Sequence, residues 1–230
     1  MKRLSLASSL FALLALTASA QIVVWDVESR DASANDPLAA NSSDPNITSA
    51  SMTLGGGISA SSANNTFRGS GFTATSLADA ITGNEYISIS VLVADGFELN
   101  ISQVDFNSGV STPVTNFNGA LLLSPTGFAS DDSQLSYSFS SSGADSQSVT
   151  LSGISALQGV SGSVELRLYG WRDNSGTSTF GVRSLSGDDF EIFGSVTASA
   201  VPEPSSFAAL AGLAMLGFVG SRRRRAVSTA

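Results

Sequence analysis

The stretch that decides the fold runs Tyr86-Ile-Ser-Ile-Ser-Val-Leu-Val93, Ala94-Asp95-Gly96, Phe97-Glu-Leu-Asn-Ile-Ser-Gln-Val-Asp-Phe106. Apolar side chains recur at every second position on both sides of Asp95-Gly96, which is typical of strands with one buried face. The Asp-Gly pair is itself typical of a tight hairpin turn. The stretch therefore predicts strands over 86–93 and 97–106 that pair as a β-hairpin. A shift in the alternation after Ile101 predicts a bulge near Ser102-Gln103.

Short alternating segments continue through the rest of the chain. We expect further strands at 22–27, 47–54, 67–75, 120–124, 135–140, 148–152, 164–171, 179–185 and 190–197. The strands at 164–171 and 179–185 are expected to pair as a second hairpin around the turn residues at 173–176. Ser76 followed by Asp79 predicts a short capped helix at 76–82. This pattern favours an all-β fold, with one antiparallel β-sandwich or jelly-roll-like domain over residues 21–200.

The composition excludes several classes of function. The 230 residues contain no cysteine and no histidine. The core must therefore hold without disulfides, and Ser-His-Asp or Cys-His nucleophilic sites and ordinary zinc, copper or haem centres are ruled out. Residues 21–200 carry five arginines against eighteen acidic residues, a net charge of −13. Such a surface does not neutralise phosphates, so nucleic acid is excluded as a partner.

Residues 1–20 have the pattern of a secretory signal peptide. Lys2 and Arg3 precede an apolar run from Leu4 to Leu16, and Ala18-Ser19-Ala20 is an A-x-A cleavage site. Cleavage after Ala20 would make Gln21 the first residue of the mature chain. The Sec translocon and signal peptidase are the expected partners, and the β domain is expected outside the cytoplasm.

The segment 201–226 contains a second signal in three parts. Pro202, Glu203 and Pro204 form a stiff spacer, because each proline fixes its φ angle and lacks an amide donor. The apolar run 207–220 has 14 residues. As a helix it spans roughly 21 Å, less than the ~30 Å hydrocarbon core, so we expect a short transmembrane helix that inserts transiently. The basic residues at its end keep the C-terminus in the cytoplasm. They are Arg222, Arg223, Arg224 and Arg225.

These three parts, in this order, resemble the PEP-CTERM sorting domain of exported proteins of Gram-negative bacteria. The resemblance covers about the last 25 to 30 residues. It implies recognition and processing by an exosortase, a membrane-embedded cysteine protease. It also implies a setting of exopolysaccharide production and biofilm. The expected location is the cell surface or extracellular matrix, after transient anchoring in the inner membrane.

Carboxylates and aromatic rings are the candidate functional groups within residues 21–200. Paired carboxylates hydrolyse glycosidic bonds, and the candidates on strands are Glu98, Asp105, Glu165 and Glu191. Solvent-exposed strand residues are the alternative interpretation. Trp171 and Tyr169 are candidates for stacking on sugar rings, and packing inside the fold is the alternative for them.

Calcium is the cofactor that acidic turns would hold, because it takes six to eight oxygen ligands. The candidate ligands are Asp188, Asp189, Asp131 and Asp132. Solvated acidic turns are the alternative, and they leave the chain without a cofactor.

The sequence thus predicts an exported, exosortase-processed surface or matrix protein, associated with exopolysaccharide and without enzymatic activity. A carbohydrate-binding module is the second hypothesis. A glycan hydrolase or lyase that uses paired carboxylates is the third.

Overall fold

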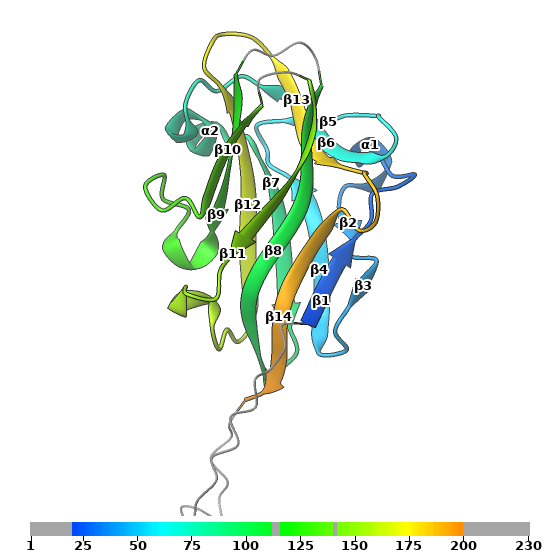
Figure 1. The fold of residues 1–230 in the computed structure, drawn as a ribbon, viewed down its shortest axis with the longest axis vertical. Helices are drawn as coiled ribbons and strands as arrows, with labels where there is room; N and C mark the ends of the chain where they lie inside the picture. The colour runs from blue at the N-terminus through cyan, green and yellow to red at the C-terminus, as the bar shows by residue number, and fades with distance from the viewer. Residues whose placement is uncertain (1–19, 112–115, 140–141, 200–230) are drawn as a thin grey trace, which may run out of the picture. The chain divides into compact units, whose positions relative to one another are not determined.

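The computed structural model describes residues 20–111, 116–139 and 142–199. They form two antiparallel sheets with a hydrophobic core between them (Figure 1). By its internal contacts the chain divides into a unit that ends at Thr197 and a second unit, 198–230, of which residues 198 and 199 are described. The predicted antiparallel all-β fold is confirmed, and the jelly-roll-like connectivity stays a prediction.

Sheet A has eight strands, and the first strand of the chain lies beside the last. Seven strands follow in the spatial order β3 (Ser42–Ser43), β1 (Ala20–Trp25), β14 (Phe190–Ala198), β8 (Phe97–Ser111), β13 (Ser178–Arg183), β6 (Thr66–Phe72) and β5 (Ser59–Ala60). The eighth, β11 (Gly143–Thr150), pairs with β8. β1 and β14 pair with Ala20 opposite Gly194, and their blue and orange arrows lie side by side in Figure 1.

Sheet B has six strands. Their spatial order is β10 (Leu135–Phe139), β9 (Phe117–Leu123), β12 (Ser163–Arg172), β7 (Tyr86–Val93), β4 (Ile47–Leu54) and β2 (Leu38–Ala39). β4 and β7 begin and end at the residues that the alternation predicts. The two-residue strands β2, β3 and β5 have too few residues to show any alternation, and the sequence did not predict them.

Among the described residues, four short helices connect the strands. They are α1 (Ala32–Asn35), α2 (Leu77–Gly83) and the 3-10 turns η1 (Ser124–Thr126) and η2 (Ser155–Leu157). α2 is the predicted helix, and its cap is confirmed because the Ser76 hydroxyl accepts a hydrogen bond from the Asp79 N–H at 3.1 Å. Ala80 of α2 packs in a small second cluster with Ala120, Leu122 and Tyr169 on the outer face of sheet B.

The predicted hairpin over 86–106 is wrong, although both of its strands exist. β7 pairs with β4 and β12 in sheet B, whereas β8 lies in sheet A. Phe97 N–H donates to the Ala94 carbonyl at 3.1 Å and Gly96 adopts a φ of 82°, so the Asp-Gly turn forms. It carries the chain from one sheet to the other instead of folding it back. An alternating pattern shows which face of a strand is buried, but not which strand lies next to it.

The second predicted hairpin is wrong for the same reason. β12 lies in sheet B and β13 in sheet A, where β13 pairs with β6 and β8. The Arg172 guanidinium fastens the connection, because it donates to the Thr177 carbonyl and the Asn174 side chain at 3.0 Å each.

The expected change of phase in β8 is confirmed: Ile101 and Val104 are both fully buried. The bulge expected near Ser102-Gln103 stays a prediction, because the regular register of β8 with β11 runs from Gln103 to Val110 and only begins at that position.

Asp189, directly before β14, connects the loop that follows β13 to β8 and to the segment that follows β1. Its fully buried carboxylate accepts hydrogen bonds from Val27 N–H at 2.9 Å, Leu185 N–H at 3.0 Å and the Asn107 amide at 3.2 Å. Burial raises the pKa of Asp189, and these three donors oppose the rise. The carboxylate thus binds donors from three parts of the chain, two of them buried.

We expect Asp189→Ala to lower the free energy of unfolding by about 3 kcal/mol or more, because each buried donor left without a partner costs ~1–3 kcal/mol. Urea unfolding followed by tryptophan fluorescence measures the change. Asp145→Ala is the matched control, since Asp145 is exposed on β11 and surface substitutions shift stability by about 0.5 kcal/mol or less. Equal midpoints for the two variants would contradict the role assigned to Asp189.

Candidate functional site

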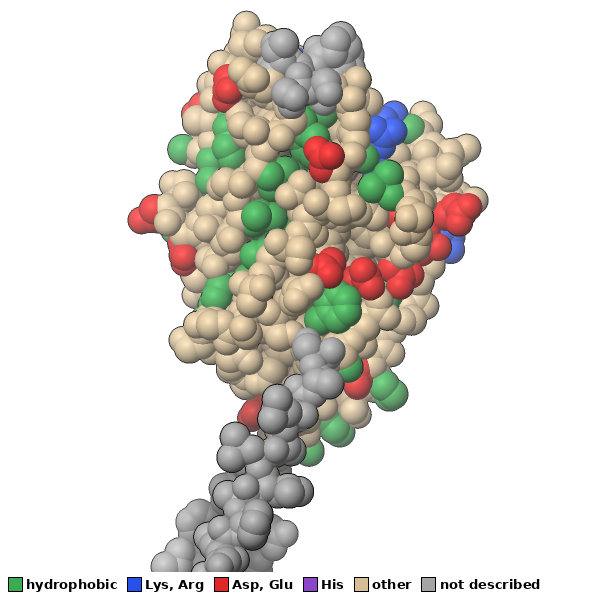
Figure 2. All heavy atoms as spheres, viewed as in Figure 1, with side chains coloured by type: hydrophobic (Ala, Val, Ile, Leu, Met, Phe, Trp, Pro, Cys, Tyr) green, Lys and Arg blue, Asp and Glu red, His purple; other side chains and the backbone are tan. Residues whose placement is uncertain are grey.

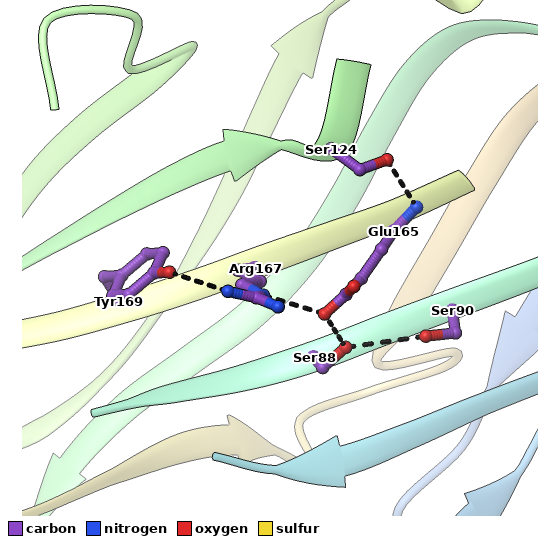
Figure 3. Close-up of polar contacts among 6 residues, drawn as sticks. All are labelled: Ser88, Ser90, Ser124, Glu165, Arg167 and Tyr169. Atoms are coloured by element: carbon purple, nitrogen blue, oxygen red, sulfur yellow. Dashed lines mark hydrogen bonds and ion pairs between the residues drawn. The ribbon is translucent and has the colours of Figure 1, made fainter. Parts of the chain in front are cut away.

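A charged network lies on the outer face of sheet B, centred on Arg167 of β12 (Figure 3). The Arg167 Nε contacts Glu165 Oε1 at 2.7 Å, and Nη1 donates to the Tyr169 hydroxyl at 3.3 Å. These residues share one face because they occupy alternate positions on the strand. The guanidinium also lies between two rings, 4.2 Å from the centroid of Tyr86 and 3.9 Å from that of Phe128. Each ring face attracts the cation.

Glu165 takes part in this network through its carboxylate and its backbone N–H. The Ser88 hydroxyl of β7 donates to Glu165 Oε1 at 2.6 Å, and the Glu165 N–H donates to the Ser124 hydroxyl at 3.0 Å. Burial lowers the pKa of Arg167, but its hydrogen bonds to Glu165 and Tyr169 outweigh that effect and raise it. Through Ser88 and Ser124, Glu165 thus connects β12 to β7 and to η1.

The aromatic residues predicted to stack on sugars are largely inside the fold. Tyr169 is fully buried under α2 and its neighbours, so the expectation that its ring is open to a ligand is wrong. Trp171 is half-buried and packs against the same small cluster. Both lie on the outward face of β12, where alternation alone indicates exposure. Helix α2 packs over this face, so Tyr169 and Trp171 are less exposed than the alternation indicates.

A second candidate site is a pocket of about 310 Å³ on the outer face of sheet A. It brings together Asp105 of β8 and Glu191 of β14, two of the four strand carboxylates proposed from the sequence. Figure 2 shows acidic side chains in a row on this face. The pocket is lined by Asp105, Phe106, Asn107, Ser146, Gln147, Ser148, Ser186, Asp188 and Glu191. Carboxylates, amides and hydroxyls thus converge on one cavity.

The carboxylates of this pocket repel one another. Burial raises the pKa of Glu191 above its ordinary value of 4.5, a hydrogen bond from Gln21 lowers it, and the nearby Asp188 and Asp105 raise it further. The Gln21 side-chain amide of β1 donates to Asp188 Oδ2 at 3.1 Å and to Glu191 Oε1. The Gln103 amide likewise donates to both oxygens of Asp105 at 2.9 Å. Neutral amide donors thus offset part of the negative charge.

The acidic residues proposed for calcium have separate surroundings. The Asp189 carboxylate is occupied by the three donors described above. Asp131 is exposed, and Asp132 Oδ1 accepts a hydrogen bond from the Gln134 amide at 3.1 Å. Within the described ranges, no three acidic side chains converge closely enough to hold a metal ion.

The predicted sorting residues Pro202, Glu203, Pro204 and Arg222 to Arg225 lie outside the described residues, as does Ala18 of the cleavage site. The apolar run 207–220, expected to be a transmembrane helix, lies outside them as well. Ala20 and Gln21, which flank the predicted cleavage point, form the first two positions of β1. In the part of the chain that the structure describes, no helix is both long and apolar enough to cross a membrane.

Comparison with known protein families identifies the C-terminal segment. Residues 200–225 match the family model described as the PEP-CTERM protein-sorting motif. The match includes the Pro-Glu-Pro residues, the apolar run and the four arginines. The motif indicates an exported protein that an exosortase processes and sorts to the cell surface. A search of curated proteins finds no relative of the chain.

We expect Arg167→Ala to lower the free energy of unfolding by about 2 kcal/mol. A partly exposed ion pair contributes about 1 kcal/mol or less, and a cation over a ring adds ~0.5–1 kcal/mol. Chemical denaturation measures the change. Arg30→Ala is the control, because Arg30 is exposed on the same domain. If both variants unfold at the same denaturant concentration, the network does not stabilise the fold.

Proposed function

We propose, from the sorting motif at residues 200–225, that this protein is a non-enzymatic component of the cell surface or extracellular matrix, associated with exopolysaccharide. This motif is the observation that carries the proposal, because it directs the β domain to the outside of the cell. Signal peptidase removes residues 1–20 during Sec-dependent export. The C-terminal segment then holds the protein in the inner membrane, with its arginines in the cytoplasm, until an exosortase cleaves it.

The described domain supports a structural role. Its charged network on sheet B is internally paired, and the buried Asp189 carboxylate is used to fasten loops. Residues 21–200 carry a net charge of −13, and such a charge keeps a protein soluble and dispersed. An acidic β domain of this kind is suited to a hydrated polysaccharide layer.

Mass spectrometry of the exported protein tests the processing. We expect Gln21 as the N-terminal residue and loss of the chain beyond the Pro-Glu-Pro region. Replacing Arg222 to Arg225 by serine is expected to impair retention and sorting, because the positive charges fix the orientation of the segment. Arg30→Ser, in the folded domain, is the control and should be sorted normally. Extracellular protein that still ends at Ala230 would count against exosortase cleavage.

A carbohydrate-binding function is the second candidate, and the pocket on sheet A favours it. Carboxylate and amide groups hydrogen-bond to sugar hydroxyls, and a few such groups in a cavity give specificity. Phe193 is half-buried and shares the outward face of β14 with Glu191, two positions away. An aromatic ring beside polar groups is an arrangement that can bind the apolar face of a sugar.

Affinity electrophoresis in gels that contain neutral or acidic polysaccharides tests this function. We expect a neutral polysaccharide to retard the protein, because the acidic pocket repels polyanions. The double variant Asp105→Ala/Gln147→Ala should weaken binding about tenfold, since each lost hydrogen bond is worth ~0.5–1.5 kcal/mol. Asp145→Ala, which lies on β11 outside the pocket lining, is the control. Absence of retardation in every gel, or equal retardation of the double variant, would rule this function out.

A further inference from the structure

The predicted signal-peptide cleavage point lies at the edge of the acidic pocket. Gln21, which cleavage after Ala20 would leave as the amino-terminal residue, is paired with Phe193 in the ladder between β1 and β14. Its side-chain amide already bridges Asp188 and Glu191. The segment that follows it, 22–25, is buried and belongs to the core. The position of Gln21 is therefore set by the sheet on one side and by two carboxylates on the other.

We propose that Asp188 and Glu191 form a docking site for the mature amino terminus and hold Gln21 there as an open, protonated glutamine. The inference rests on the proposed export and on cleavage before Gln21. The site takes a group of defined chemistry, an α-ammonium with a primary amide on the same residue. The two carboxylates neutralise the charge of the α-ammonium and accept hydrogen bonds from the primary amide.

An amino-terminal glutamine has a characteristic reaction that this site opposes. The neutral α-amine attacks the side-chain carbonyl carbon Cδ, a Cδ–N bond forms, and the Cδ–Nε2 bond breaks. The former side-chain nitrogen leaves as ammonia, taking up the proton that the amine gives up. The product is a five-membered lactam without a basic nitrogen. No oxidant, reductant or further reactant is required.

Two features of the docking site slow this reaction. Cyclisation requires the side chain to fold back over its own α-nitrogen, whereas the Gln21 amide is held by Asp188 Oδ2 at 3.1 Å and by Glu191 Oε1. Cyclisation also requires the unprotonated amine. Nearby negative charge stabilises the ammonium and raises the pKa of the α-amine, so less of the nucleophile is present.

The acidic groups facing this position come from three elements. Glu191 lies on β14, Asp188 in the loop before it, and Asp105 on β8. In the chain that still carries Ala20 they have no α-ammonium beside them, and the pKa of Glu191 is raised by burial and by its acidic neighbours. Cleavage creates a cation at this place. The new charge favours the ionised form of Glu191, and Glu191 in turn favours the protonated form of the amine.

The test measures cyclisation of the exported protein. The full chain is expressed with its leader, the exported product is isolated, and intact-mass analysis follows the loss of one ammonia during incubation at neutral pH. We expect wild-type protein to keep a linear Gln21. The double variant Asp188→Ala/Glu191→Ala should cyclise about tenfold faster or more, because a fall of one unit in the amine pKa gives about ten times more free amine. The rate of cyclisation of this double variant should also reach its plateau at a lower pH than that of the wild type.

The control is Glu28→Ala/Asp145→Ala, which removes the same number of charges from exposed positions and should behave as wild type. Asp188→Asn/Glu191→Gln keeps the acceptors without the charges and should show the shifted pH profile with a smaller increase in rate. Equal rates in the first double variant and in the control would overturn the docking site. An exported chain that does not begin at Gln21 would instead overturn the proposed cleavage, and the docking site with it. Cooperative urea unfolding of each variant verifies that it is folded.

Discussion

Aromatic packing across the core is the interaction on which the two sheets depend. Phe117 of β9 in sheet B lies 5.1 Å from Phe180 of β13 and 6.0 Å from Phe72 of β6, both in sheet A, between ring centroids. All three side chains are fully buried. Since the chain contains no cysteine, no disulfide joins the layers. Burial of such rings, at about 1.5–3 kcal/mol for each side chain, supplies the cohesion instead.

Buried carboxylates complement this core at the ends of strands. Asp189 binds donors from three segments, and Glu85, just after α2, binds donors from one segment, Thr73-Ala74. Its Oε2 accepts the N–H groups of Thr73 at 2.8 Å and Ala74 at 3.0 Å. Each carboxylate accepts backbone N–H groups from residues outside the strands. The acidic composition thus serves the fold as well as the surface.

Strand positions could be predicted from the sequence because alternation reports directly which side chains face the core. Ile87, Ile89 and Val91 are buried as their spacing indicates. Strand partners could not be predicted, because an Asp-Gly turn serves a hairpin and a crossing between sheets equally well. The alternate positions of Glu165, Arg167 and Tyr169 indicated a shared face. The closure of Phe128 over Arg167 and the burial of Tyr169 under α2 depend on contacts between distant segments, which a local pattern does not contain.

The pairing of the first strand with the last has a consequence for the order of events during synthesis and export. β1 stays without its main partner until β14 has been made, and Ala20 and Gly194 are separated by nearly the whole domain. Folds dominated by such distant contacts form slowly, because loop closure must precede any gain from pairing. Sheet A can therefore be completed only after the chain has been made and exported as far as the end of β14, at Ala198. The sorting motif begins at residue 200, two residues after β14 ends, so the domain can complete sheet A only when almost all of the chain before the motif is available.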